Sequence, residues 1–262
     1  MNITIIVGWV VCFGLVVFGI LNGGSGNIGM FIDIPSVAIT IGGTFGVLIA
    51  MFPLSTLKTI PKLLKIAILP PKYNPREYID NLVEYAKIAR SKGLLALEDS
   101  ANKCSDPFMK ESLMLIVDAN DPDKVRAMLE DAIDFTAERH AAGREFFAKG
   151  VSMAPAFGML GTLVGLVIML NNMNQDPDGL GLAMATALIT TFYGSLLANV
   201  IFSPLETALK NANDSEVLCM QIVVEGVMSI AAGSNPRLIQ EKLEFMLPKS
   251  QGKPKESAKA EE

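Results

Sequence analysis

Four long apolar stretches without a charged side chain limit what this 262-residue chain can fold into. They cover residues 3–21, 34–52, 151–170 and 182–202. Each has close to the roughly 20 residues that an α-helix needs to cross the hydrocarbon core of a bilayer. The chain combines 50% hydrophobic with 19% charged residues, which is typical of spans that alternate with a solvated domain. We therefore predict an all-α polytopic membrane protein with four transmembrane helices and a helical cytoplasmic domain.

The basic residues predict how the chain is oriented in the membrane. All 22 Lys and Arg side chains fall within residues 58–149 or 210–259. Because basic residues next to spans are retained on the cytoplasmic side, both termini and the long middle segment are predicted to be cytoplasmic. The two outer loops carry only acidic charges, Asp33, Asp176 and Asp178, which either cap the loops or attract cations.

This topology divides the chain into five segments. Residues 1–53 and 151–204 each hold two spans with a short outer loop, residues 54–150 form a helical cytoplasmic insert, and residues 205–248 form a cytoplasmic helical tail. Residues 249–262 are rich in Lys, Glu, Ser and Pro and are predicted to be disordered.

Helix starts recur in the cytoplasmic segments. Asn74, Asp106, Asp121 and Asn235 each precede a proline, which suits an N-cap followed by the first helical position. Glu77, three residues after Asn74, predicts a capping box, in which the two side chains bind the amides left free at a helix start.

The charge distribution argues against nucleic acid and agrees with membrane lipid as a partner. The net charge of −5 is spread over mixed-sign segments and forms no basic patch. Residues 55–69 alternate Lys with apolar residues directly after the second span. They form either a helix against anionic membrane lipid or an ordinary amphipathic connector.

The sequence indicates neither an enzyme nor a bound cofactor. Cys12, Cys104 and Cys219 have no metal-ligand or disulfide spacing, and the single histidine, His140, has no partner pattern nearby. The sequence contains no phosphate loop, dinucleotide fingerprint, nucleophile elbow or zinc-protease motif. We predict no catalytic residue, no metal site and no cofactor.

The third and fourth apolar stretches differ from the first two in carrying many hydroxyl groups, among them Thr162, Thr190 and Thr191. Such a cluster in a bilayer forms either a packed polar interface or a hydrated path. Gly161 and Gly165 have the spacing that lets two helix backbones approach closely.

Two prolines stand near the predicted cytoplasmic ends of these spans. Pro155 and Pro204 each remove a backbone donor. They either bend or stop the helix as simple punctuation, or act as hinges that join the spans to the cytoplasmic helices.

The apolar stretches contain no Asp or Glu. Ion transport through hydrocarbon normally depends on a carboxylate that binds and releases the ion. If the chain takes part in ion-driven work, this carboxylate must come from a partner helix.

Three sequence motifs resemble the MotA/PomA family of flagellar stator subunits. They are Ala-Pro-Ala-Phe-Gly-Met-Leu-Gly-Thr-Leu-Val-Gly-Leu at 154–166, Thr-Thr-Phe-Tyr-Gly at 190–194 and Ala-Arg-Ser-Lys-Gly-Leu-Leu-Ala-Leu-Glu at 89–98. Together with four spans and a large insert after the second, the resemblance covers nearly the whole chain.

The resemblance implies a pentamer of this chain around two copies of a MotB/PomB-like partner, whose single span carries the membrane Asp. It places the complex in the bacterial cytoplasmic (inner) membrane. Ion flow would drive rotation of the pentamer, which turns the rotor protein FliG.

Functional residues of the family are carried over by motif. Arg90 and Glu98 match rotor-binding charges, with Asp99 as a helper, and Pro155 and Pro204 match two functional prolines. Opposite charges suit repeated encounters that must also release quickly.

Three threonines form the ion path that the resemblance implies. Thr191 matches the threonine beside the partner carboxylate. Thr162 and Thr190 stand where sodium-type members tend to have Thr and proton-type members Ala. The transported ion is therefore expected to be Na+, with H+ as the other possibility, because a hydroxyl is a hard oxygen ligand for a cation.

Two other functions are open. An ExbB/TolQ-like energiser of envelope transport also surrounds a carboxylate-bearing partner, but it resembles a three-span protein without the 89–98 segment. A passive scaffold or a self-contained channel is weakened by the hydroxyl cluster and by the missing carboxylate.

Overall fold

The structure is a computed structural model that describes residues 2–23, 28–118, 121–173 and 180–247. Over these ranges the regular elements are all helices, and no strand is present. Four of the helical stretches are long and apolar enough to cross a membrane. The all-α fold class with four spans is confirmed. Residues 249–262, which we predict to be disordered, and the acids Asp176 and Asp178 lie outside the described residues.

The chain forms two compact units. The membrane unit comprises residues 1–71 and 140–212, and the helical unit comprises residues 72–139 and 213–262. The helices α9 (Pro122–Asn172) and α11 (Ser203–Ala231) contribute to both units. The segment boundaries that we predict after residues 150 and 204 therefore fall inside continuous helices.

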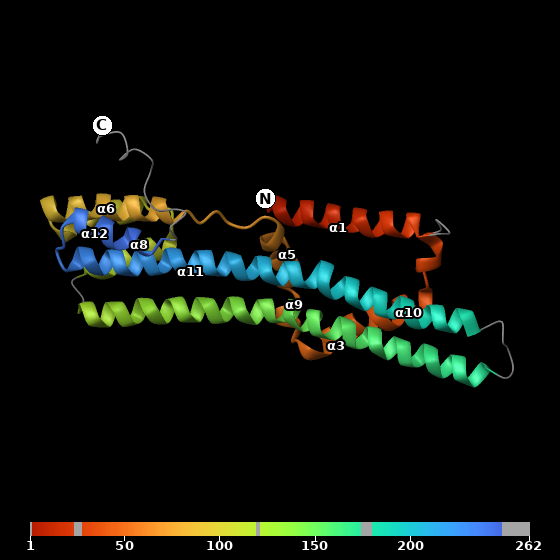
Figure 1. Cartoon of the computed structure of the whole chain (residues 1–262). Coiled ribbons are helices and arrows are strands. Elements are labelled where there is room, and N and C mark those ends of the chain that lie inside the picture. Colours follow the sequence, from red (N-terminus) through yellow and green to blue (C-terminus); the bar gives the residue numbers. More distant parts are fainter. Residues whose placement is uncertain (1, 24–27, 119–120, 174–179, 248–262) are drawn as a thin grey trace, which may run out of the picture. The chain divides into compact units, whose positions relative to one another are not determined.

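The membrane unit contains the four candidate spans (Figure 1). The first is α1 (Ile3–Asn22), and the second consists of α2 (Ile34–Val37), the π-helical turn η2 (Ala38–Gly42) and α3 (Gly43–Met51). The third is the last part of α9, and the fourth is α10 (Leu180–Leu196), which continues through the π-helical η4 (Leu197–Phe202) into α11. Shorter helices are η1 (Ile28–Phe31), α4 (Leu54–Leu57) and α5 (Ile60–Ile68).

A cluster of aromatic side chains forms the core of the membrane unit. Phe147 lies between Phe146 and Phe202, with ring centroids 5.5 and 6.5 Å apart. Gly150 makes room for this contact, because a Cβ at Gly150 would lie 2.5 Å from the Phe202 ring. An ion pair of 3.3 Å between Arg144 Nε and Glu206 Oε1 joins the same two helical stretches.

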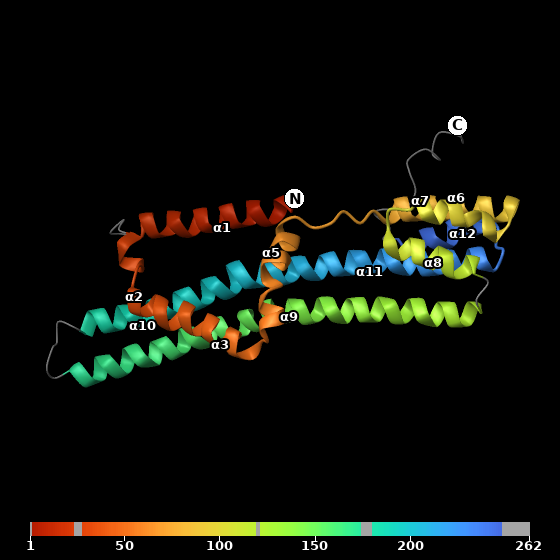
Figure 2. The same ribbon diagram turned by 180° about the vertical axis from the view of Figure 1, so that it is seen from behind.

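The helical unit packs seven helical segments around one apolar core. They are α6 (Pro75–Lys92), η3 (Leu94–Ala96), α7 (Leu97–Lys103), α8 (Pro107–Val117) and α12 (Pro236–Glu244), together with the parts of α9 and α11 that belong to this unit. Leu82 of α6 and Leu243 of α12 are fully buried in this core. The helices α6 and α12 run side by side in both views (Figures 1 and 2).

Three of the four predicted helix starts carry a side-chain cap. Asp106 accepts from Met109 N at 2.8 Å, Asn235 from Arg237 N at 3.0 Å and Asp121 from Asp123 N at 3.1 Å. The capping box at Asn74 is wrong, because that side chain makes no cap bond. The Glu77 backbone amide instead donates to the Asn74 backbone carbonyl at 3.0 Å.

One carboxylate joins three helical segments of the helical unit. Glu225 of α11 binds Arg126 of α9 at 3.2 Å and also binds Lys242 of α12. The hydrogen bond from Lys242, followed by that from Arg126, lowers the pKa of Glu225, although burial opposes the shift.

We expect Glu225→Gln to destabilise the helical unit in a pH-dependent way. Since the pKa of Glu225 is lower in the folded chain than its usual 4.5, the charged form stabilises the fold above that pH. This contribution disappears as the pH falls through the folded-state pKa. The cost at pH 7 is about 1 kcal/mol, measured by thermal unfolding of the purified protein.

The matched control is Glu130→Gln, which removes the exposed partner of Arg126. It should change the melting temperature much less. A Glu225→Gln effect that is equally large at pH 7 and at about pH 3 would contradict the electrostatic explanation.

Candidate functional site

The third and fourth spans are in backbone contact along glycine positions. A Cβ at Gly161 would lie 2.5 Å from Thr190 Cβ, and one at Gly165 would lie 2.8 Å from Ala187 Cβ. On α10, a Cβ at Gly194 would lie 2.6 Å from the Ala154 carbonyl oxygen. The helices α9 and α10 lie side by side in both views (Figures 1 and 2). The close helix packing that the glycine spacing predicts is therefore present.

Thr190 lies inside this contact. Its side chain is fully buried against Gly161, and its hydroxyl donates to the Ala187 carbonyl at 2.8 Å. Its own carbonyl accepts from the Thr40 hydroxyl of the second span at 3.4 Å. Of the three predicted ion-path threonines, Thr190 thus has its hydroxyl turned into the helix contact.

Thr162 and Thr191 share one side of the α9–α10 pair. Gly161 and Thr190 contact each other, and Thr162 and Thr191 are the residues that follow them. One position along an α-helix turns a side chain by about 100° around the helix axis. Because the two helices are antiparallel, both turns lead to the same side of the pair. We call this side, defined by Thr162 and Thr191, the threonine face.

The threonine face is open in the single chain. Thr191 is exposed and Thr162 is half-buried, with its hydroxyl bound to the Met159 carbonyl at 2.6 Å. The second span contacts α10 through Thr40, on a side that leaves Thr191 uncovered. The structure therefore brings Thr162 and Thr191 together as accessible hydroxyls and separates Thr190 from them.

A line of buried hydroxyls in the second span was missed by the sequence analysis, which placed the hydroxyl groups in the third and fourth spans. Ser36, Thr40 and Thr44 are all fully buried. The Ser36 hydroxyl donates to the Thr186 carbonyl at 3.2 Å, and Thr44 donates to the Thr40 carbonyl at 2.6 Å. Their spacing of four residues puts them on one face of a helix, and this spacing is the signal that was overlooked.

Asp33, directly before the second span, acts as a helix cap. Its carboxylate accepts from the Ser36 amide at 2.9 Å and from the Ser36 hydroxyl. Nearby, the Tyr193 hydroxyl donates to the Phe31 carbonyl, which joins η1 to α10. Of the two interpretations of Asp33, the structure supports a loop cap.

Neither Pro155 nor Pro204 stops a helix. Pro155 lies inside the 51-residue α9, and Pro204 lies within the continuous helical stretch Leu180–Ala231, directly after η4. The interpretation of these prolines as helix stops is wrong. A hinge role stays a prediction.

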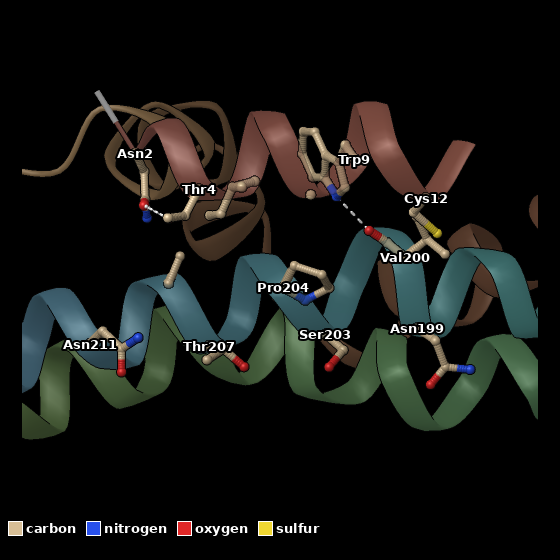
Figure 3. A pocket seen from close by; sticks show the side chains of 13 residues that line it. Asn2, Thr4, Trp9, Cys12, Asn199, Val200, Ser203, Pro204, Thr207 and Asn211 are labelled. Carbon is tan, nitrogen blue, oxygen red and sulfur yellow. Dashed lines mark hydrogen bonds between the residues drawn. The ribbon is translucent and has the colours of Figure 1, made fainter. Parts of the chain in front are cut away.

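A carbonyl of the π-helical turn that precedes Pro204 is bound from another span. In this turn the Ser203 amide donates to the Ala198 carbonyl, five positions earlier, and the amide of the next residue would donate to a carbonyl of the same turn. Proline has no amide hydrogen. Instead, Trp9 Nε1 of α1 donates to the Val200 carbonyl at 2.6 Å (Figure 3).

The predicted rotor-binding residues gather at one corner of the helical unit. Arg90 lies in the last turn of α6, and Glu98 and Asp99 lie in the first turn of α7. Gly93 makes the bend between these helices with φ +86°, a conformation that side chains disfavour. All three charged side chains are exposed and none forms an ion pair within the described residues.

The corner also has an apolar side chain between its charges. Leu95 of η3 is 75% exposed, while Leu97 next to it is fully buried and anchors the bend. The arrangement leaves both signs of charge free for a partner, around an apolar point of contact.

Family models match most of the chain. Residues 6–93 match the N-terminal region of motility protein A, and residues 100–222 match the MotA/TolQ/ExbB proton channel family.

Individual proteins are similar over nearly their full length. Motility protein A of Borreliella burgdorferi is 40% identical, covering 95% of both chains. The chemotaxis protein PomA of Vibrio alginolyticus is 39% identical, covering 94% of this chain and 96% of PomA. A chain of the flagellar MotAB stator complex from Bacillus subtilis superposes with a TM-score of 0.85 at 29% identity, covering 94% of this chain and 96% of that one.

We expect Gly161→Leu to separate the third and fourth spans. The new side chain would overlap Thr190, and relief of such overpacking costs about 1–3 kcal/mol or more. The measurement is the yield of folded protein extracted from membranes and its melting temperature. Gly46→Leu is the matched control, since a Cβ at Gly46 meets nothing within 4 Å. Equal losses for both variants would argue against a special role of the Gly161 contact.

Proposed function

Since the chain belongs to the motility protein A family, we propose that it is the MotA/PomA-type subunit of a flagellar stator, a channel component and not an enzyme. With a MotB/PomB-like partner it forms an ion channel in the bacterial inner membrane and couples ion flow to rotation. The observation that carries this proposal is the open threonine face in spans that have no carboxylate.

The threonine face is half of an ion site. Thr162 and Thr191 offer hydroxyl oxygens, which can contact an ion or its water shell but do not bind and release a proton near neutral pH. The carboxylate must therefore come from the partner's membrane helix. Because this side of α9 and α10 is uncovered in the single chain, the partner helix has room to lie against it.

Assembly of several copies agrees with the exposed apolar surface of the spans. In α1 none of the side chains is buried, and Leu163 and Val167 of α9 are 64% and 66% exposed. Such surfaces are covered in a membrane by lipid or by neighbouring subunits. We infer a pentamer around a partner dimer, with membrane lipid on its outside and both termini in the cytoplasm.

The charged corner of the helical unit would bind the rotor and transmit torque to it. Arg90, Glu98 and Asp99 are exposed and have no ion pair with any residue that the structure describes, so we propose that they bind opposite charges on the rotor protein FliG. Partly exposed charge pairs form and break quickly, which suits a surface that must engage one rotor subunit after another.

Pro155 and Pro204 would transmit movement from the ion site. Each lies in a helix that continues from a span into the helical unit. A proline weakens its helix locally, because one backbone hydrogen bond is missing. We propose that both prolines act as coupling hinges.

Sodium is the ion we propose, with H+ as the alternative. Thr162 supports this choice because its oxygen lies on the threonine face. Thr190 supports sodium only through the family resemblance at its position, because its hydroxyl is buried at the Gly161 contact.

An ExbB/TolQ-like energiser is the second candidate, and the match over residues 100–222 includes both groups. The match of residues 6–93 to motility protein A, the four candidate spans and the charged corner favour the stator. Rescue of envelope transport without rescue of motility would favour the energiser.

The first test is the swimming speed of stator-deficient cells that express this chain with its own partner. At constant pH, replacement of external sodium by potassium should stop motility. Thr191→Ala should abolish or strongly slow swimming in sodium, while Thr191→Ser, which keeps the hydroxyl, should retain most of it. Motility that persists in potassium would identify H+ as the ion, and normal swimming of Thr191→Ala would remove Thr191 from the ion path.

The second test reverses a charge at the corner. Arg90→Glu should lower motor torque, because it repels the rotor charge that Arg90 attracts, while membrane assembly stays unchanged. Lys124→Glu, an exposed charge on α9, is the matched control and should leave torque near normal. Torque measured on tethered cells that is equal for both variants would exclude a specific role of Arg90.

A further inference from the structure

The bond between Trp9 and Val200 connects the first span to the place where Pro204 interrupts helical hydrogen bonding. The donor and acceptor are 191 positions apart in sequence, and 2.6 Å separates the indole nitrogen from the carbonyl oxygen. A backbone carbonyl without a partner in a membrane costs several kcal/mol in hydrocarbon. Pro204 supplies no donor to the π-helical turn before it, and the indole N–H of Trp9 donates to a carbonyl of that turn.

The first span has few other ties to the membrane unit. None of its side chains is buried. The backbone N–H of Asn2, just before the span, donates to the Ile68 carbonyl of α5 at 2.7 Å. Among the described residues, Trp9 is the side chain of α1 that makes a hydrogen bond to another span.

The surroundings of Pro204 leave space for movement. A cavity of about 530 Å³ lies between α1 and the stretch from η4 to α11. Its lining includes Gly8 and Trp9 on one side and Ser203, Pro204 and Thr207 on the other. Figure 3 shows the Pro204 ring on the side of its helix that faces α1, one turn from the Trp9 bond.

The helix around this point also departs from regular α geometry. The π-helical η4 covers Leu197–Phe202 and ends two residues before Pro204. Such turns inside α-helices often occur at functional sites, because the hydrogen-bond pattern can shift there. A proline, a π-helical turn and free volume therefore occur together at this point of the helix, and the Trp9 donor reaches the same turn.

We propose that Trp9 is a positioning residue for the Pro204 hinge: its indole N–H holds the Val200 carbonyl in one arrangement, and movement at the hinge must break or re-form this bond. The inference rests on the stator function proposed above. It assigns the first span a part in coupling, beyond contact with lipid.

The test is a double-mutant cycle of Trp9→Phe and Pro204→Ala in the full chain, co-expressed with its partner. Trp9→Phe keeps an aromatic ring and removes the N–H. Pro204→Ala restores a backbone donor directly after the π-helical turn that contains Val200. Trp9→Phe should therefore lower the melting temperature of the purified complex by roughly 2–4 °C when residue 204 is Pro, and by much less when it is Ala.

A second readout addresses coupling. Trp9→Phe should reduce the torque of single stator units in bead assays, with wild-type amounts of complex in the membrane. Phe13→Leu, which changes another aromatic side chain of α1 that is 38% exposed, is the matched control and should leave both readouts unchanged.

Two results would overturn the inference. An equal fall in melting temperature in both backgrounds, or no fall in either, would show that Trp9 does not compensate for Pro204. Normal torque of Trp9→Phe would show that the bond does not position the hinge. If the wild-type chain does not restore motility, the proposed stator function fails, whereas the thermal cycle still decides whether Trp9 replaces the missing donor.

Discussion

Pairing of backbone polar groups away from water is the constraint on which the membrane unit depends. Hydrocarbon offers no alternative partner, so each helix must satisfy its own carbonyls or borrow a donor from a neighbour. Thr40 donates to the Thr190 carbonyl, Ser36 to the Thr186 carbonyl and Trp9 to the Val200 carbonyl. Of the three acceptors, Val200 lies in the π-helical η4, where regular pairing is interrupted, while the other two lie within α10.

The same constraint explains why the third and fourth spans can carry an open face with two threonines. Glycines bring α9 and α10 into backbone contact, so the pair is stabilised by close packing and needs no polar side chain between them except Thr190. Thr162 and Thr191 are thereby left on one open side. A site that lacks its carboxylate is harmless alone, since the ion has no binding group until a partner helix arrives. We infer that dividing the site between two chains links channel activity to assembly.

Much of this arrangement follows from local sequence rules. The length of the apolar stretches and their lack of charged residues predict the four spans. Asp106 and Asn235, each before a proline, predict two capped helix starts. The spacing of Gly161 and Gly165 predicts close packing of a span. Each of these features depends on residues that are near one another in sequence.

Features that depend on tertiary contacts were not predictable in the same way. Whether a threonine faces a neighbour or an open surface depends on the rotation of its helix, so the adjacent residues Thr190 and Thr191 looked equivalent in sequence. The Asn74 cap failed because backbone bonds alone complete that helix start. The bond from Trp9 joins positions 191 residues apart, and no local pattern indicates it. A proline within a span nevertheless implies a carbonyl without its donor four residues earlier, so a search for the group that replaces that donor is a general way to find contacts between spans.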